Sequence, residues 1–114
     1  MKLPNAEIAV VEQAKICGYL LNSAHRFGAS KARFFAAFDF TFDAWDVLAV
    51  ALKQHAAENE VVKLKQTGFG PRYEVEGELA TPDRRRPRIR SIWQMDEGQG
   101  APRLITAYPL EAIQ

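Results

Sequence analysis

The chain has 114 residues, of which 47% are hydrophobic and 25% are charged, and its 15 basic and 14 acidic residues leave a net charge of +1. This length and composition predict one globular domain over residues 1–114, with no run of the roughly 20 apolar residues that a membrane span needs. So small a net charge counts against a dedicated nucleic-acid binder. The N-terminal residues lack the apolar stretch of a signal peptide, so we expect a cytoplasmic protein without membrane contact.

Cys17 is the only cysteine, which excludes an internal disulfide and any metal site built from several cysteines. His25 and His55 are the only histidines, so a tetrahedral zinc site would also need carboxylate ligands. We therefore expect neither a metal nor another cofactor, and we interpret Cys17 as a small core or boundary residue.

The first regular segment is a helix over residues 11–21, where apolar residues recur at helical spacing and Asn22-Ser23 supplies a stop. Residues 23–29 show no period and contain turn-forming residues. Ser30 then offers an N-cap for a short, phenylalanine-rich second helix.

A third helix begins near Asp43 and Asp46, whose carboxylates suit the positive end of the helix dipole. Its apolar residues recur at steps of three and four, which predicts a face that lies on a sheet: Trp45, Leu48, Ala49, Leu52 and Ala56. His55 comes late in this helix among polar neighbours, so we expect it at the surface.

Beyond residue 60 the hydrophobic period changes to two, as in half-buried strands. Four such segments are separated by turn-forming stretches at residues 67–71, 81–84 and 97–102. Sequential hairpins are the simplest topology for this spacing, and one layer of helices suffices to cover one face. The predicted fold is therefore α+β, with about three N-terminal helices packed on a four-stranded antiparallel meander.

The loop between the first two helices carries His25, six residues before Lys31. Loops held by a rigid scaffold are where functional residues concentrate. An imidazole can transfer a proton near neutral pH, and an ammonium group can stabilise charge on a phosphoryl oxygen. A single loop histidine is more often a structural hydrogen-bonder, so the functional hypothesis needs other polar residues to converge on it.

The last two strands offer such residues. Ser91 and Trp93 share one face of their strand with Arg90 on the other, and Thr106 and Tyr108 share a face of the next strand. Each of these types also has an ordinary packing role in a sheet. Together with the histidine and lysine, they would suffice for metal-free RNA cleavage: a proton-transfer group, cations for phosphate, and hydroxyl groups.

Five arginines crowd the segment from Arg84 to Arg90. The ordinary interpretation is a solvated turn flanked by cross-strand Arg–Glu pairs. The alternative functional interpretation is a non-enzymatic module that binds a partner protein along an exposed sheet edge, or nucleic acid through this Arg84–Arg90 basic patch.

Several stretches together resemble a family of short, uncharacterised bacterial domains found in toxin–antitoxin loci and at the C-terminal tips of polymorphic toxins. They are spread along nearly the whole chain: Leu3–Glu7, Tyr19–Asn22 with His25, Gly28–Phe35, Ile89–Trp93 and Pro102–Pro109. In layout the chain also resembles the ribonuclease-toxin fold group that includes barnase, EndoU-type nucleases, colicin nucleases and RelE. The resemblance implies a metal-independent ribonuclease toxin with an RNA substrate and a small cognate antitoxin or immunity protein.

The resemblance also implies roles for particular residues. The implied catalytic residues, with His25 as general acid or base, are His25, Lys31, Ser91 and Thr106. The implied substrate-binding residues, for phosphate contact and base stacking, are Arg26, Arg90, Trp93 and Tyr108. Two positions depart from the family pattern, since Arg26 stands where proline is usual and Asp39 where glycine commonly follows the second helix.

Overall fold

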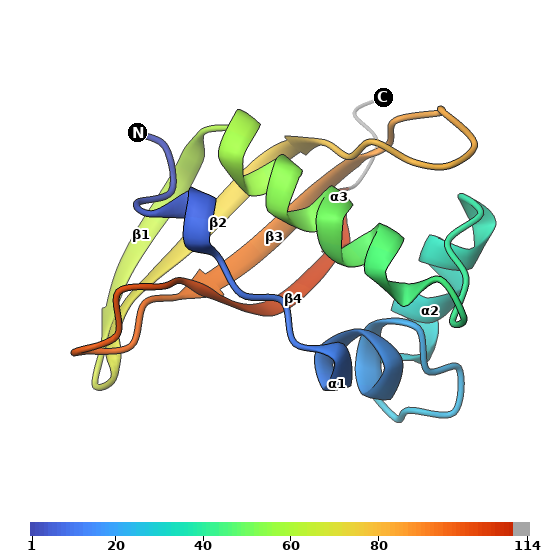
Figure 1. Cartoon of the computed structure of the whole chain (residues 1–114), viewed down its shortest axis with the longest axis horizontal. Helices are drawn as coiled ribbons and strands as arrows, with labels where there is room; N and C mark the ends of the chain where they lie inside the picture. Colours follow the sequence, from blue (N-terminus) through green and yellow to red (C-terminus); the bar gives the residue numbers. More distant parts are fainter. Residues whose placement is uncertain (111–114) are drawn as a thin grey trace.

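Helices occupy the first half of the chain and strands the second half (Figure 1). The computed structural model describes residues 1–110. The helical segments are η1 (Ala6–Ile8), α1 (Gln13–Lys15), the π-helical turn η2 (Ile16–Leu20), α2 (Ala29–Ala37) and α3 (Trp45–Glu58). The strands are β1 (Val61–Thr67), β2 (Gly70–Glu78), β3 (Arg88–Gln94) and β4 (Arg103–Pro109). The predicted α+β class is confirmed, and no helix within residues 1–110 is long and apolar enough to cross a bilayer.

The sheet has the order β1-β2-β3-β4, and every strand is antiparallel to its neighbour in sequence. The tight turn between β1 and β2 ends at Gly70, whose φ of 124° is accessible to glycine and strained for other residues. In the β3–β4 register, Thr106 lies opposite Ile92 and Tyr108 lies opposite Arg90. Paired residues share a face of the sheet, so Arg90, Thr106 and Tyr108 lie on the same face.

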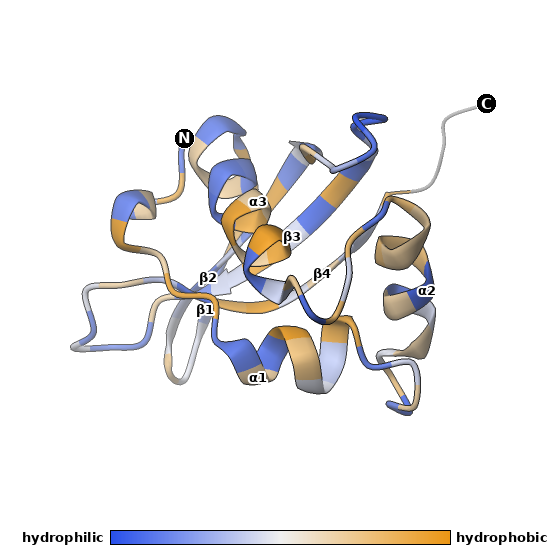
Figure 2. Ribbon diagram, turned by 45° about the vertical axis from the view of Figure 1, so that its right-hand side comes forward, coloured by the Kyte–Doolittle hydropathy of each residue, from blue (hydrophilic) through white to orange (hydrophobic). Residues whose placement is uncertain are grey.

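The α3 helix lies across one face of this sheet (Figure 1). Figure 2 shows the apolar residues on α3 and the alternation of polar and apolar residues along the strands. Fully buried side chains from both layers form the core, among them Leu48, Leu52, Val75, Ile89 and Trp93. Burying a leucine or valine side chain stabilises the fold by about 1.5–3 kcal/mol, so the side chains between α3 and the sheet contribute much of the stability.

The two edges of the sheet differ. The edge of β4 is partly covered by Val10, whose amide donates to the Pro102 carbonyl (2.8 Å) and whose carbonyl accepts from Leu104 N (3.0 Å). On β1, the Val61 amide donates to the Met1 carbonyl (2.7 Å). No residue from 62 to 66 forms a backbone hydrogen bond with anything but β2 in the described part of the chain.

Two local expectations were wrong, and one is refined. The expected first helix forms over residues 13–20, but its second part is π-helical, because Leu21 N bonds to Ile16 O (2.7 Å), five residues back, and widens the last turn. Ser30 is not the N-cap of α2, since the helix starts one residue earlier and Gly28 takes that position. Val62 and Leu64 are 54% and 47% exposed rather than half-buried, because β1 is an edge strand that bulges at Val62.

Candidate functional site

Polar side chains from four elements meet around Tyr19. The π-helical turn η2 carries this residue to the β4 edge, where its hydroxyl lies 3.1 Å from the Thr106 Oγ1. Lys15, one helical turn earlier, and Lys31 of α2 each place their Nζ 5.5 Å from the centre of the Tyr19 ring. The His25 ring packs edge-on against it, with ring centres 5.0 Å apart. Two cations, an imidazole and two hydroxyl groups therefore lie within one cluster.

This cluster forms a shallow, open pocket of about 430 Å³, lined by Lys15, Tyr19, His25, Phe27, Ile105 and Thr106. Phe27 is 67% exposed at its rim. The volume falls in the range of small-molecule sites. A pocket lined by an exposed phenylalanine ring and a lysine suits a ligand that combines an aromatic ring with an anion.

Backbone hydrogen bonds fix the His25 ring. The amides of Phe27 and Gly28 both donate to its Nδ1, each at 3.0 Å. An amide can only donate, so Nδ1 carries no proton and the neutral ring holds its proton on Nε2. Nε2 has no hydrogen-bond partner among residues 1–110. In this tautomer the free nitrogen of His25 is a hydrogen-bond donor and cannot accept a proton.

Gly28 allows the His25 loop to approach η2 closely. A Cβ atom at this position would lie 2.4 Å from the Tyr19 carbonyl oxygen and 2.9 Å from its ring. Any larger residue would therefore push the loop away from Tyr19. The glycine thus keeps His25 beside the Tyr19 ring.

The cations around the pocket are not neutralised by acids. Lys31 Nζ donates to the Phe27 carbonyl (3.3 Å), and the Arg26 guanidinium lies 5.3 Å from the Phe27 ring. Neither these residues nor Lys15 take part in an ion pair among residues 1–110. The pocket is therefore suited to bind an anion.

On the uncovered face of the sheet, Arg90 lies beside Tyr108 and diagonally across from Thr106. Its Nη1 donates to the Tyr108 hydroxyl (3.1 Å), and Nη2 bonds to Glu76 (3.0 Å), with Glu74 at 3.5 Å from Nε. These bonds to Tyr108 and Glu76 raise the pKa of Arg90 above its usual range, so the guanidinium is permanently charged. It is also engaged by carboxylates, so contact with a phosphate would require exchange of one of them.

Ser91 and Trp93 lie on the opposite face of β3, beneath α3. The Trp93 indole N–H donates to the Ser91 Oγ (2.8 Å), and this oxygen lies 2.9 Å from the His55 Nδ1. The His55 Nε2 is 3.2 Å from the Gly77 carbonyl, which can only accept. His55 thus holds its proton on Nε2, and the Ser91 hydroxyl donates to Nδ1. We call these four residues the buried histidine network.

The buried histidine network corrects one expectation. His55 is 1% exposed, so its predicted surface position is wrong. Burial lowers its pKa below the ordinary imidazole value, so the ring is neutral near pH 7. The signal was present in the sequence, because position 55 follows Leu48 by seven residues and Leu52 by three, on the apolar face of α3.

The structure thus divides the residues implied by the resemblance. It brings His25 and Thr106 together in the lining of one pocket and places Lys31 beside the Tyr19 ring. Arg26 lies next to Phe27 at the rim, and Arg90 and Tyr108 are adjacent on the uncovered face. It places Ser91 and Trp93 on the other side of the sheet. Sequence reasoning missed Lys15 and Tyr19, although their spacing of four residues put them on one face of a helical turn.

The Arg84–Arg90 run is largely engaged within the fold. Arg85 bonds to Asp83 and to the Ala37 carbonyl at the end of α2, and its guanidinium stacks 4.3 Å from the Phe38 ring. Arg86 pairs with Glu78 (3.0 Å). Two members of the run, Arg84 and Arg88, are exposed and form no ion pair within residues 1–110. This internal pairing weakens the argument for a nucleic-acid patch.

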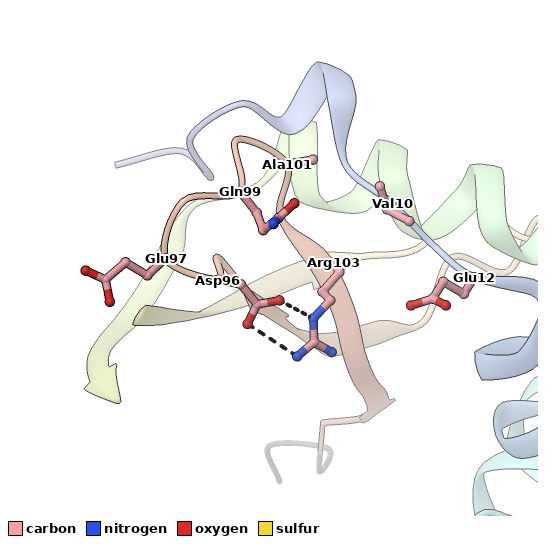
Figure 3. A pocket seen from close by; sticks show the side chains of 7 residues that line it. All are labelled: Val10, Glu12, Asp96, Glu97, Gln99, Ala101 and Arg103. Atoms are coloured by element: carbon pink, nitrogen blue, oxygen red, sulfur yellow. Dashed lines mark hydrogen bonds and ion pairs between the residues drawn. The ribbon is translucent and has the colours of Figure 1, made fainter. Parts of the chain in front are cut away.

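A second pocket, of about 320 Å³, lies beside the start of β4 (Figure 3). Its charged centre is Arg103, which bonds to both carboxylate oxygens of Asp96 at 2.6 and 3.4 Å. This guanidinium holds the pKa of Asp96 below its usual range. Because the two charges neutralise each other, we interpret this pair as a structural contact that stabilises the β3–β4 connection.

No group of three or more potential metal ligands from His, Cys, Asp and Glu gathers within residues 1–110.

The sequence profile of the family described as "Domain of unknown function (DUF6883)" matches residues 2–111. The chain belongs to this family. No curated protein matches it in sequence.

Among solved structures, the chain is similar to a chain of the contact-dependent growth inhibition toxin–immunity protein complex from Klebsiella pneumoniae 342. The two share 19% sequence identity with a TM-score of 0.71, over 94% of this DUF6883 chain and 97% of the other. At this identity the likeness shows a common fold. The expected membership of the broader ribonuclease-toxin fold group stays a prediction.

Proposed function

We propose that this DUF6883 domain is a toxin that cleaves RNA without a metal ion. The observation that carries the proposal is the convergence on Tyr19 of two lysines without acidic partners, the His25 ring and the Thr106 hydroxyl, at an open pocket that Lys15, His25 and Thr106 line. The fold shared with a chain of a toxin–immunity complex supports the toxin role and a cognate immunity protein as the partner.

RNA carries its own nucleophile, so such an enzyme mainly needs to position the chain and stabilise charge. The 2′-oxygen attacks the adjacent phosphorus and loses its proton to water, while the bond from phosphorus to the 5′-oxygen breaks and that oxygen takes a proton from water, which reaches this open pocket. Lys15 and Lys31 would hold the phosphate, and the Thr106 or Tyr19 hydroxyl would donate to a non-bridging oxygen. The exposed Phe27 ring would stack on a base.

The hydrogen bonds of His25 refine its expected role as general acid or base. With Nδ1 occupied by two amides, the Nε2–H group can donate to a phosphoryl oxygen as negative charge develops there. Proton transfer through Nε2 would require both loop bonds to break. We therefore favour a fixed donor over a proton-transfer group.

Two substitutions separate these roles in an assay of RNA cleavage in EDTA. His25→Gln can place an amide N–H near the position of Nε2, whereas His25→Asn keeps an acceptor for the loop and loses the distal donor. For a fixed donor we expect a fall of about 100-fold for His25→Asn and about tenfold for His25→Gln. Equal losses of about 100-fold or more in both variants would favour proton transfer instead.

Lys53→Ala, on the exposed side of α3, is the matched control and should cleave RNA at the parental rate. The same variants can be expressed in bacteria, where the parent should arrest growth and His25→Asn should relieve the arrest. The proposal fails if the purified parent leaves RNA intact in EDTA and its expression does not slow growth.

A further inference from the structure

The free edge of the sheet, at β1, combines unpaired backbone groups, exposed apolar side chains and lysines without acidic partners. The proposed nuclease pocket uses none of them. Residues 62–66 have no backbone hydrogen bonds on the side away from β2, in the part of the chain that the structure describes. Val62 and Leu64 on this strand are 54% and 47% exposed, and Phe69 at the adjoining turn is 74% exposed. An edge with unpaired backbone groups and exposed apolar side chains is a template for another strand.

The charges on this edge favour one kind of strand. Lys63 lies opposite Glu74, but Glu74 forms an ion pair with Arg90 instead (3.5 Å from Nε). Lys65 lies directly opposite Arg72, and like charges in this position destabilise a sheet. Lys63, Lys65 and Arg72 form no ion pair within residues 1–110.

The two faces of β1 differ in character. Leu64 pairs with the buried Tyr73, so it lies on the α3 side of the sheet, whereas Lys63 and Lys65 lie on the uncovered side. A strand added beside β1 would therefore meet apolar side chains on one face and cations on the other. A carboxylate on the added strand would lie beside Lys65, on the side away from Arg72, and would give this lysine an acidic partner.

A second copy of this chain does not fit the edge. Two β1 strands side by side would bring Lys63 and Lys65 against the same residues of the other copy, and the bulge at Val62 would interrupt the pairing. Lysines on edge strands commonly prevent such self-association.

We propose that β1 is a docking edge for a partner protein that presents an extended strand with acidic residues on one face and apolar residues on the other. The strand pairs with residues 62–66, its carboxylates contact Lys63 and Lys65, and its apolar side chains cover Leu64. This mode of recognition obtains affinity from main-chain bonds and specificity from alternate side chains. It does not depend on whether the pocket cleaves RNA.

The test uses the full chain, labelled with ¹⁵N, and the capped synthetic peptide Thr-Glu-Val-Glu-Val-Glu-Thr as the probe. We expect amide shifts on titration that concentrate in residues 62–66. Lys63→Glu with Lys65→Glu should weaken binding at least tenfold, and a peptide with lysine in place of glutamate should restore binding to that variant.

Arg33→Glu with Arg84→Glu is the matched control, because it makes the same change in net charge at two exposed arginines elsewhere. It should leave the affinity for the acidic peptide within about twofold, and the spectrum of each free variant verifies its fold. The proposal is overturned by any of three results: no shifts at 1 mM peptide, shifts centred on the Arg84–Arg88 loop, or equal weakening by the two variants.

Discussion

The two histidines of this domain are held in opposite ways. His25 stands in an open loop, with Nδ1 bonded to two backbone amides and Nε2 free. His55 lies beneath α3 with both nitrogens bonded, to Ser91 and to the Gly77 carbonyl. An imidazole with one free nitrogen can meet a ligand, whereas one with two partners specifies a packed core. The partners of the second nitrogen therefore decide what each histidine can do.

The same distinction explains why Ser91 and Trp93 belong with His55. Their polar atoms are already satisfied by one another, and both side chains are fully buried. Around Tyr19, by contrast, Lys15 and Lys31 have no acidic partner and the His25 Nε2 has no hydrogen-bond partner, within residues 1–110. Satisfied polar groups stabilise the fold, and unsatisfied ones at an open surface are available for binding.

Replacing each histidine by alanine should separate the two regions most strongly. His55→Ala leaves a cavity and removes the partners of Ser91 and the Gly77 carbonyl, so we expect a loss of about 3 kcal/mol in the free energy of unfolding. His25→Ala removes the acceptor of two loop amides and the edge contact of a half-exposed ring with Tyr19, for which about 1 kcal/mol is expected. Urea unfolding measures both, and equal losses would contradict the comparison.

Gly28→Ala tests whether the close approach of the His25 loop to Tyr19 matters. The new methyl group would clash with the Tyr19 carbonyl, so we expect a loss of about 1–2 kcal/mol in unfolding free energy. The displaced loop should also change the ¹⁵N–¹H shifts of residues 25–31. Gly18→Ala is the control, since a Cβ there meets no atom within 4 Å, and it should leave those shifts in place.

The smallest expected effect is a dependence of stability on pH that comes from His55. Its pKa is lowered by burial in the folded state, while the unfolded chain titrates near the ordinary value of about 6.5. As the pH falls below that value the unfolded state binds the proton first, so stability declines until the folded pKa is reached. Above about pH 6.5 the His55 ring is neutral in both the folded and the unfolded state, so its contribution to stability is constant.

Urea unfolding between pH 7.5 and pH 5 measures this decline before most carboxylates titrate. His55→Gln should flatten the profile, whereas Lys53→Ala, an exposed change that retains both histidines, should keep the parental slope. An unchanged slope in His55→Gln would mean that another group causes the dependence.

Much of the fold could be predicted from the sequence because local patterns of hydrophobic and turn-forming residues determine where the helices and strands lie. The change from helical to alternating period near residue 60 locates α3 and the strands, and the turn residues between them imply hairpins. The π-helical turn could not be predicted, since it arises from a single backbone bond between Leu21 and Ile16 that no local pattern announces.

The candidate site was predictable only in part. His25 and Lys31 stand out because they flank an irregular loop, and Thr106 because it follows a strand pattern. The face on which each strand residue lies relative to the helices depends on tertiary packing, which is why Ser91 could not be separated from Thr106.

Asp39, where the family resemblance leads one to expect glycine, has a φ of 71°, a conformation that glycine adopts without strain.

The contact of Val10 with β4 has a consequence for the order of folding. The sheet itself closes through short hairpins between neighbours in sequence, each a local event that forms rapidly. The bonds from Val10 to Pro102 and Leu104 join residues more than 90 positions apart, so they carry a large loop-closure entropy. We expect this N-terminal segment to dock last, and the Val10 and Leu104 amides to exchange their hydrogens earlier than those at the centre of β3.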